Sequence, residues 1–117
     1  MIYILLEKEA GIGYSQTEKY DSVRRDTIRE MNNLPFEHTY KASDPDLLPT
    51  KIVVEGFESY VRKYNINIWL AAEVKKCVPS CEGVGWIINV RKGKEVYLIQ
   101  TKHLILSIGA SLSVPIL

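Results

Sequence analysis

The apolar residues change from a helical to a strand period at Ile66, and this change most constrains the fold. Before it, Val53, Phe57 and Tyr64 fall on one face of a helix, because they are spaced by four and seven residues. After it, apolar and polar residues alternate through residues 66–75, which is typical of a half-buried strand. The sequence therefore predicts a helix that is followed by strands.

Two more alternating segments, residues 84–91 and 95–103, flank Lys92 and Gly93. A short turn between two alternating runs is typical of a β-hairpin. In such a hairpin, cross-strand neighbours share a face. We expect one face to carry four large apolar side chains, namely Trp86, Ile88, Tyr97 and Ile99.

The N-terminal half predicts a strand at residues 1–9 and two helices. Ser15 with Glu18 forms a capping-box pattern that starts a helix, which we expect to end at Asn32 and Asn33. Asp46 is the expected N-cap of the second helix, with Pro49 in its first turn. Residues 36–41 could add a short edge strand.

The 117 residues, 46% of them hydrophobic, are enough for one domain. The order strand, helix, helix, then three strands predicts an α+β fold. We expect two helices on one face of a mainly antiparallel sheet of four to five strands, with a possible C-terminal strand. The single domain would span residues 1–117.

The two cysteines, Cys77 and Cys81, stand between two predicted strands. If the three intervening residues form the loop, the two thiols could be joined in a disulfide. Together with His38 and His103 they could instead form a Cys2His2 zinc site. Two reduced cysteines without a metal are the third possibility.

Asp46 after Pro45, followed by Glu73 and Lys75, resembles the P-D…E-x-K pattern of restriction-endonuclease-like nucleases. That resemblance implies that Asp46 and Glu73 hold Mg²⁺ and that Lys75 positions the attacking water. The alternative is that Asp46 caps a helix and that Glu73 and Lys75 form the solvated side of a strand. The order of elements is also similar to that of RelE-like ribonuclease toxins, although no site accompanies this likeness.

Four residues between the first strand and the first helix could receive a phosphate on backbone amides: Gly11, Gly13, Ser15 and Thr17. Gln16 takes the place of the third glycine of G-x-G-x-x-G, so a turn with an N-cap is the better interpretation.

Charge is unevenly distributed along the chain. Residues 1–60 contain seven Lys and Arg against eleven Asp and Glu, a formal charge of −4, whereas residues 61–117 contain eight against three, a charge of +5. The basic strand region could contact nucleic-acid phosphates, or its lysines could protect sheet edges from aggregation. The candidate contact residues are Lys75, Lys76, Arg91, Lys92, Lys94 and Lys102.

The C-terminal segment, residues 104–117, is rich in Leu and Ile and is too short to span a membrane as a helix. Its apolar side chains must be covered, and we expect a homodimer formed through this segment. No secretory signal pattern is present, which predicts a cytoplasmic location. Together these features predict a small binding or accessory protein without a cofactor.

Overall fold

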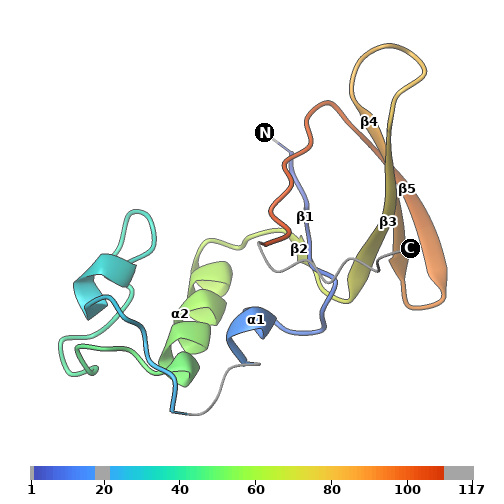
Figure 1. Cartoon of the computed structure of the whole chain (residues 1–117). Coiled ribbons are helices and arrows are strands. Elements are labelled where there is room, and N and C mark those ends of the chain that lie inside the picture. The colour runs from blue at the N-terminus through green and yellow to red at the C-terminus, as the bar shows by residue number, and fades with distance from the viewer. Residues whose placement is uncertain (1, 18–21, 110–117) are drawn as a thin grey trace. The chain divides into compact units, whose positions relative to one another are not determined.

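The computed structural model describes residues 2–17 and 22–109 and divides the chain into two compact units, Met1–Glu73 and Val74–Leu117. The N-terminal unit holds the helices and a two-stranded sheet, and the C-terminal unit holds most of a three-stranded sheet (Figure 1). The elements in chain order are β1 (Leu5–Leu6), α1 (Tyr14–Thr17), the 3-10 helix η1 (Arg29–Asn32), α2 (Thr50–Lys63), β2 (Ile68–Trp69), β3 (Ala72–Pro79), β4 (Trp86–Lys92) and β5 (Glu95–Thr101).

The predicted arrangement of two helices on one mainly antiparallel sheet is wrong. Among the described residues only α2, with 14 residues, is longer than a single turn. The five strands form two sheets, and β1 pairs with β2 in parallel. A parallel pair needs a crossover connection, and α2 lies within the chain that joins these two strands.

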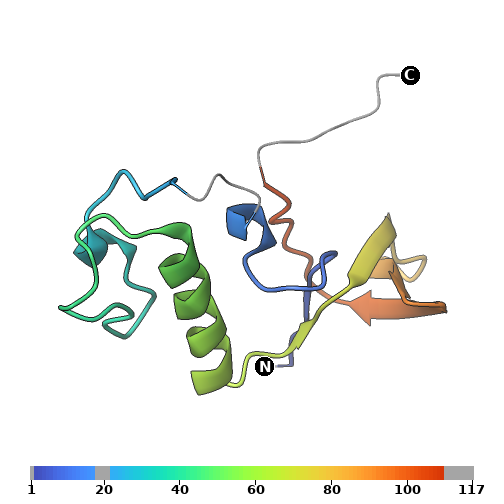
Figure 2. The same cartoon turned by 90° about the horizontal axis from the view of Figure 1, so that it is seen from below.

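Within the described residues, the helix predicted from Ser15 to Asn33 is present only as α1 and η1. The intervening backbone binds the segment before α2: the Arg25 amide donates to Leu48 O at 2.9 Å and the Arg29 amide to Asp46 O at 2.7 Å. These amides are therefore not available for hydrogen bonds within a helix. Figures 1 and 2 show the described part of this connection, residues 22–28, passing the N-terminal end of α2 on its way to η1. Glu18, the second member of the predicted capping box, lies outside the described residues.

The second predicted helix is confirmed as α2, but its predicted cap is not. Pro49 occupies the N-cap position, and no side chain caps the helix. Asp46 lies upstream of the helix, 3.6 Å from Nη1 of Arg29. The buried face of α2 packs Val53 against Tyr40 and Leu48, which form the core of this unit.

The long strand predicted from Ile66 is divided into β2 and β3. Ala71 has a φ of 52°, in the left-handed region, and this bend ends the regular alternation. β2 then pairs with β1, while β3 pairs with β4. One predicted strand therefore supplies two different sheets.

The hairpin of β4 and β5 is confirmed. Its register places Ile88 opposite Ile99 and Lys92 opposite Glu95, so the turn consists of Gly93 and Lys94, one residue later than predicted. Trp86, Ile88, Tyr97 and Ile99 share one face, as predicted. Ile88 and Val90 are the buried residues of this hairpin.

No strand forms at residues 36–41 or at residues 104–109. Asn33 Oδ1 accepts from the Thr39 amide, and Thr39 Oγ1 accepts from the Leu34 amide, which closes residues 33–39 into a loop. Three apolar side chains of the C-terminal segment, Ile105, Leu106 and Ile108, are exposed. Residues 110–117, the rest of that segment, lie outside the described residues. In the part of the chain that the structure describes, no helix has the length and apolar character that crossing a membrane requires.

Candidate functional site

The candidate site lies at the carboxyl end of β1. Glu7 follows the last residue of this strand and is half-buried. Its amide donates to Trp69 O at 2.9 Å, and its carbonyl accepts from the Ala72 amide at 2.9 Å. Both backbone groups of Glu7 are thus fixed by the segment that contains β2.

The side chain of Glu7 is held as well. Its Oε1 accepts the Glu9 amide at 2.9 Å, which closes a tight turn just beyond the strand. Glu9 O accepts from the Ala71 amide at 2.8 Å, so a hydrogen bond joins the turn to the segment between β2 and β3. Among the described residues, the Glu9 amide is the one hydrogen-bond partner of the Glu7 carboxylate.

The carboxyl end of a parallel strand is a common place for a binding site, because open α/β sheets bind ligands outside the carboxyl ends of their strands. An ionised carboxylate only accepts hydrogen bonds, so it selects ligands that donate them. Ribose hydroxyl groups are such donors, and dinucleotide-binding folds place an acidic residue against them.

The glycines after β1 have a structural explanation. Gly13 has a φ of 73°, and a Cβ there would lie 3.2 Å from Phe57 Cδ2 and 3.3 Å from Val54 Cγ2. Gly13 therefore lets the loop bend in the left-handed region and approach α2 closely. This geometry supports the turn interpretation of Gly11 and Gly13 over the phosphate loop.

The cysteines are both free, with Cys77 half-buried and Cys81 exposed. Cys77 lies inside β3 and the loop to β4 begins after Pro79, so the cysteines do not flank a three-residue loop as predicted. His38 belongs to the N-terminal unit and His103 to the C-terminal unit. The described residues contain no group of three side chains arranged to hold a metal ion.

The structure separates Asp46 from the other two residues of the nuclease pattern. Asp46 pairs with Arg29 ahead of α2, whereas Glu73 and Lys75 lie on β3 and share a face by alternation. Asp46 thus forms an ion pair with Arg29, a residue of its own unit. Among the described residues, Asp46 does not belong to any group of three acidic, histidine or cysteine side chains that could hold a metal ion.

The six basic residues predicted to contact nucleic acid all lie on or beside the three-stranded sheet. Lys75 and Lys76 are consecutive on β3, and Arg91 and Lys92 are consecutive on β4, so each pair points to opposite faces. Lys94 lies in the hairpin turn and Lys102 just beyond β5. The cations are therefore divided between two faces and do not form one basic surface.

Comparison with known proteins relates the chain to redox enzymes. No family model matches it. Over 115 residues it is 30% identical to the uncharacterized oxidoreductase CzcO of Bacillus subtilis, covering 92% of this chain and 29% of that protein. Its fold matches a flavin-containing monooxygenase from Stenotrophomonas maltophilia with a TM-score of 0.68 at 15% identity, covering 82% of this chain and 28% of that one.

These comparisons correct two expectations. The similar proteins are named as an oxidoreductase and a flavin-containing enzyme, which overturns the prediction of a protein without a cofactor and gives no support to Mg²⁺ or to the nuclease. They give no support to nucleic-acid binding either. The chain spans less than a third of the length of each of these two relatives, and it is similar in sequence and fold to a segment of a redox enzyme.

The sequence interpretation missed Glu7 because the predicted strand extended to Glu9 and so placed Glu7 inside it. The available signal was an acidic residue directly after the apolar run that ends at Leu6. An acidic residue after a strand indicates a binding site only when the strand is known to be parallel to its neighbour. The pairing of β1 with β2 joins residues more than sixty positions apart, and no local pattern in the sequence predicts it.

Proposed function

We propose that this chain forms part of the dinucleotide-binding region of a flavin-dependent oxidoreductase. In this proposal Glu7 accepts hydrogen bonds from the ribose hydroxyls of the adenosine half of the dinucleotide. The observation that carries it is the position of a fixed carboxylate at the carboxyl end of a parallel strand. The oxidoreductase and flavin-containing relatives support the choice of ligand.

The residues present fit such a ligand. The Glu9 amide holds Oε1 of Glu7, and this contact orients the carboxylate before a ligand arrives. A preorganised acceptor loses less conformational entropy on binding than a mobile one. Hydrogen bonds to an ionised acceptor are also stronger than those between neutral groups.

The charge of Glu7 also selects among dinucleotides. A carboxylate repels the 2′-phosphate of NADP, for which an arginine is the usual partner, and accepts a free 2′-hydroxyl. FAD and NAD therefore fit this position better than NADP. When FAD is bound, its flavin ring supplies the redox chemistry, while Glu7 and its turn bind and orient the adenosine half.

Binding of FAD to the purified chain tests the proposal. Quenching of flavin fluorescence during titration gives the dissociation constant for the wild type and for Glu7→Gln. The substitution keeps the shape of the side chain but removes its charge, so we expect the affinity to fall about tenfold, or ~1.4 kcal/mol.

The matched control is Glu55→Gln, which removes the same charge from an exposed position on α2, 4.0 Å from Lys51 Nζ. We expect its affinity for FAD to equal that of the wild type. Absence of FAD binding by the wild-type chain, or equal weakening in both variants, would contradict the proposal.

A further inference from the structure

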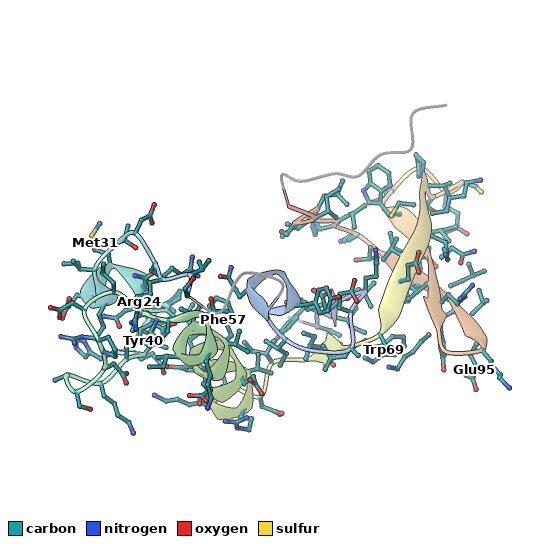
Figure 3. All side chains as sticks on the ribbon, turned by 60° about the horizontal axis from the view of Figure 1, so that its bottom comes forward. Arg24, Met31, Tyr40, Phe57, Trp69 and Glu95 are labelled. Atoms are coloured by element: carbon teal, nitrogen blue, oxygen red, sulfur yellow. The ribbon has the colours of Figure 1, made fainter. Side chains whose placement is uncertain are left out.

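The two outer strands of the three-stranded sheet differ in how their edges are protected. The strand order is β3-β4-β5, so β3 and β5 are the outer strands (Figure 1). β3 carries Lys75 and Lys76 and ends at Pro79, and natural sheets use lysine and proline at an edge to prevent pairing with another chain. β5, with the sequence EVYLIQT, contains neither residue and has one charge, that of Glu95 at its first position. In Figure 3 the labelled Glu95 marks the hairpin end of this strand.

The backbone of β5 presents hydrogen-bonding groups along its outer edge. A two-residue turn joins Lys92 to Glu95, so these two residues form a hydrogen-bonded pair, and pairs of this kind alternate with non-hydrogen-bonded pairs along the hairpin. The amide and carbonyl groups that point away from β4 therefore belong to Val96, Leu98 and Gln100. In the part of the chain that the structure describes, β4 is the one strand that pairs with β5.

The side chains of this strand are apolar and exposed. Val96 is 62% exposed and Leu98 is 71% exposed, and both lie on one face because they are two residues apart. Tyr97, on the other face, is 36% exposed. Residues 103–109, which follow β5, form no strand that could cover this edge. An exposed edge strand with high β-propensity is a template for pairing with a further strand.

We propose that β5 pairs with β5 of a second copy of this chain, antiparallel and about a twofold axis at Leu98. Residues whose backbone groups point outward form the hydrogen-bonded pairs of the new contact, so Val96 pairs with the partner's Gln100 and Leu98 pairs with the partner's Leu98. Each of these pairs forms two backbone hydrogen bonds. The same strand supplies both sides of the contact, as a twofold interface requires. The contact lies in the C-terminal unit, whereas Glu7 lies in the N-terminal unit, so neither proposal depends on the other.

The side chains of β5 favour a second copy as the partner. In this register Leu98 lies beside the partner's Leu98, and Tyr97 lies beside the partner's Ile99, so apolar side chains meet on both faces of the extended sheet. Glu95 lies opposite the partner's Thr101, so no like charges face each other within the paired strands. A contact of seven residues from each strand is small, so we expect weak association, with a dissociation constant in the micromolar range.

Exchange of charges at Leu98 tests this pairing, because the twofold axis places the residue opposite itself. The full chain carries Ile105→Ser and Ile108→Ser as a background, which removes the association expected from the C-terminal segment. Sedimentation equilibrium of this background should show a monomer that dimerises as its concentration rises through the micromolar range. Leu98→Lys and Leu98→Glu should each raise the dissociation constant about tenfold, because like charges then face each other. An equimolar mixture of the two variants should dimerise again, because opposite charges then face each other.

Val84→Lys is the matched control. Val84 is 65% exposed and lies in the loop between β3 and β4, so the substitution adds the same charge to an equally exposed valine outside β5. We expect its dissociation constant to equal that of the background.

A second measurement needs no substitution in β5. In a mixture of isotope-labelled and unlabelled background chains, NMR should detect a contact between the α-protons of Tyr97 and the partner's Ile99, which face each other in a non-hydrogen-bonded pair. A monomer at every concentration, the result expected if another segment of the same chain covers β5, would overturn the proposal. Equal weakening by Val84→Lys, a mixed sample that stays monomeric, or open-ended aggregates in place of a dimer would overturn it as well.

Discussion

The packing of Tyr40 against α2 depends on the absence of a single side chain. Gly56 is buried in the middle of the helix, where glycine is normally less favourable than alanine by about 1 kcal/mol. A Cβ at this position would lie 2.8 Å from Tyr40 Cε1 and 2.9 Å from its hydroxyl oxygen. The glycine is therefore explained by the close approach of the ring.

Gly56→Ala should accordingly destabilise the chain, although alanine favours a helix. The Tyr40 ring is buried and cannot move aside freely, so we expect overpacking to cost about 1–3 kcal/mol. Denaturation in urea measures the change. Gly11→Ala is the control, because a Cβ there meets nothing within 4 Å, and it should be close to neutral. Equal stability of Gly56→Ala and the wild type would show that the ring is not held in place.

At the level of elements, α2 is held to the preceding loop at its C-terminal end. Lys63 Nζ lies 2.8 Å from Glu37 Oε2, and the Tyr60 hydroxyl donates to Pro35 O at 3.3 Å. The hydrogen bond from Lys63 lowers the pKa of Glu37, and the same bond raises the pKa of Lys63. The contact therefore has a defined dependence on pH.

Because the folded state lowers the pKa of Glu37, the stabilisation is fully present above the ordinary glutamate range and is lost as the pH falls through the folded pKa. Because it raises the pKa of Lys63, the stabilisation is lost at the alkaline end as the pH rises through that pKa. Glu37→Gln should thus be less stable than the wild type at neutral pH and equal to it well below about pH 4. Denaturation at several pH values measures this difference, and a difference that persists in acid would refute the assignment.

Two valines of the β4–β5 hairpin differ in their burial. Val90 on β4 has no exposed surface, whereas Val96 on β5 is 62% exposed. Val90→Ala should reduce the free energy of unfolding by about 1–3 kcal/mol, because it removes buried methyl groups and leaves a cavity. Val96→Ala has the same change in strand propensity and should cost less than about 1 kcal/mol. Equal costs would mean that burial does not stabilise this hairpin.

These elements also show which parts of the fold the sequence predicts. The periods of α2 and of the β4–β5 hairpin are local, and the structure confirms both. The failed helix after Ser15 has a helical pattern, but its amides bind residues 46–48, a contact that no local pattern records. Glu7 escaped the prediction for the same reason, since a parallel strand distant in sequence defines its surroundings.

At the scale of the whole molecule, self-association stays a prediction. The exposed Ile105, Leu106 and Ile108 motivate it, together with the apolar residues that follow them in the sequence. Size-exclusion chromatography with light scattering should give a mass near 27 kDa, twice the 13.4 kDa of the chain. Ile105→Ser with Ile108→Ser should shift the mass toward the monomer, whereas a monomeric wild type would remove this expectation.

In the function proposed above, the Glu7 carboxylate accepts hydrogen bonds from the hydroxyl groups of a ribose at the end of a parallel strand. Calorimetric titration of the chain with ADP and with 2′-deoxy-ADP tests it most directly, because the two ligands differ by one hydroxyl group. The wild type should bind ADP more tightly by about 10- to 150-fold, the value of one hydrogen bond to a charged group, and Glu7→Gln should lose most of this preference. Equal binding of the two nucleotides by the wild type would contradict the account.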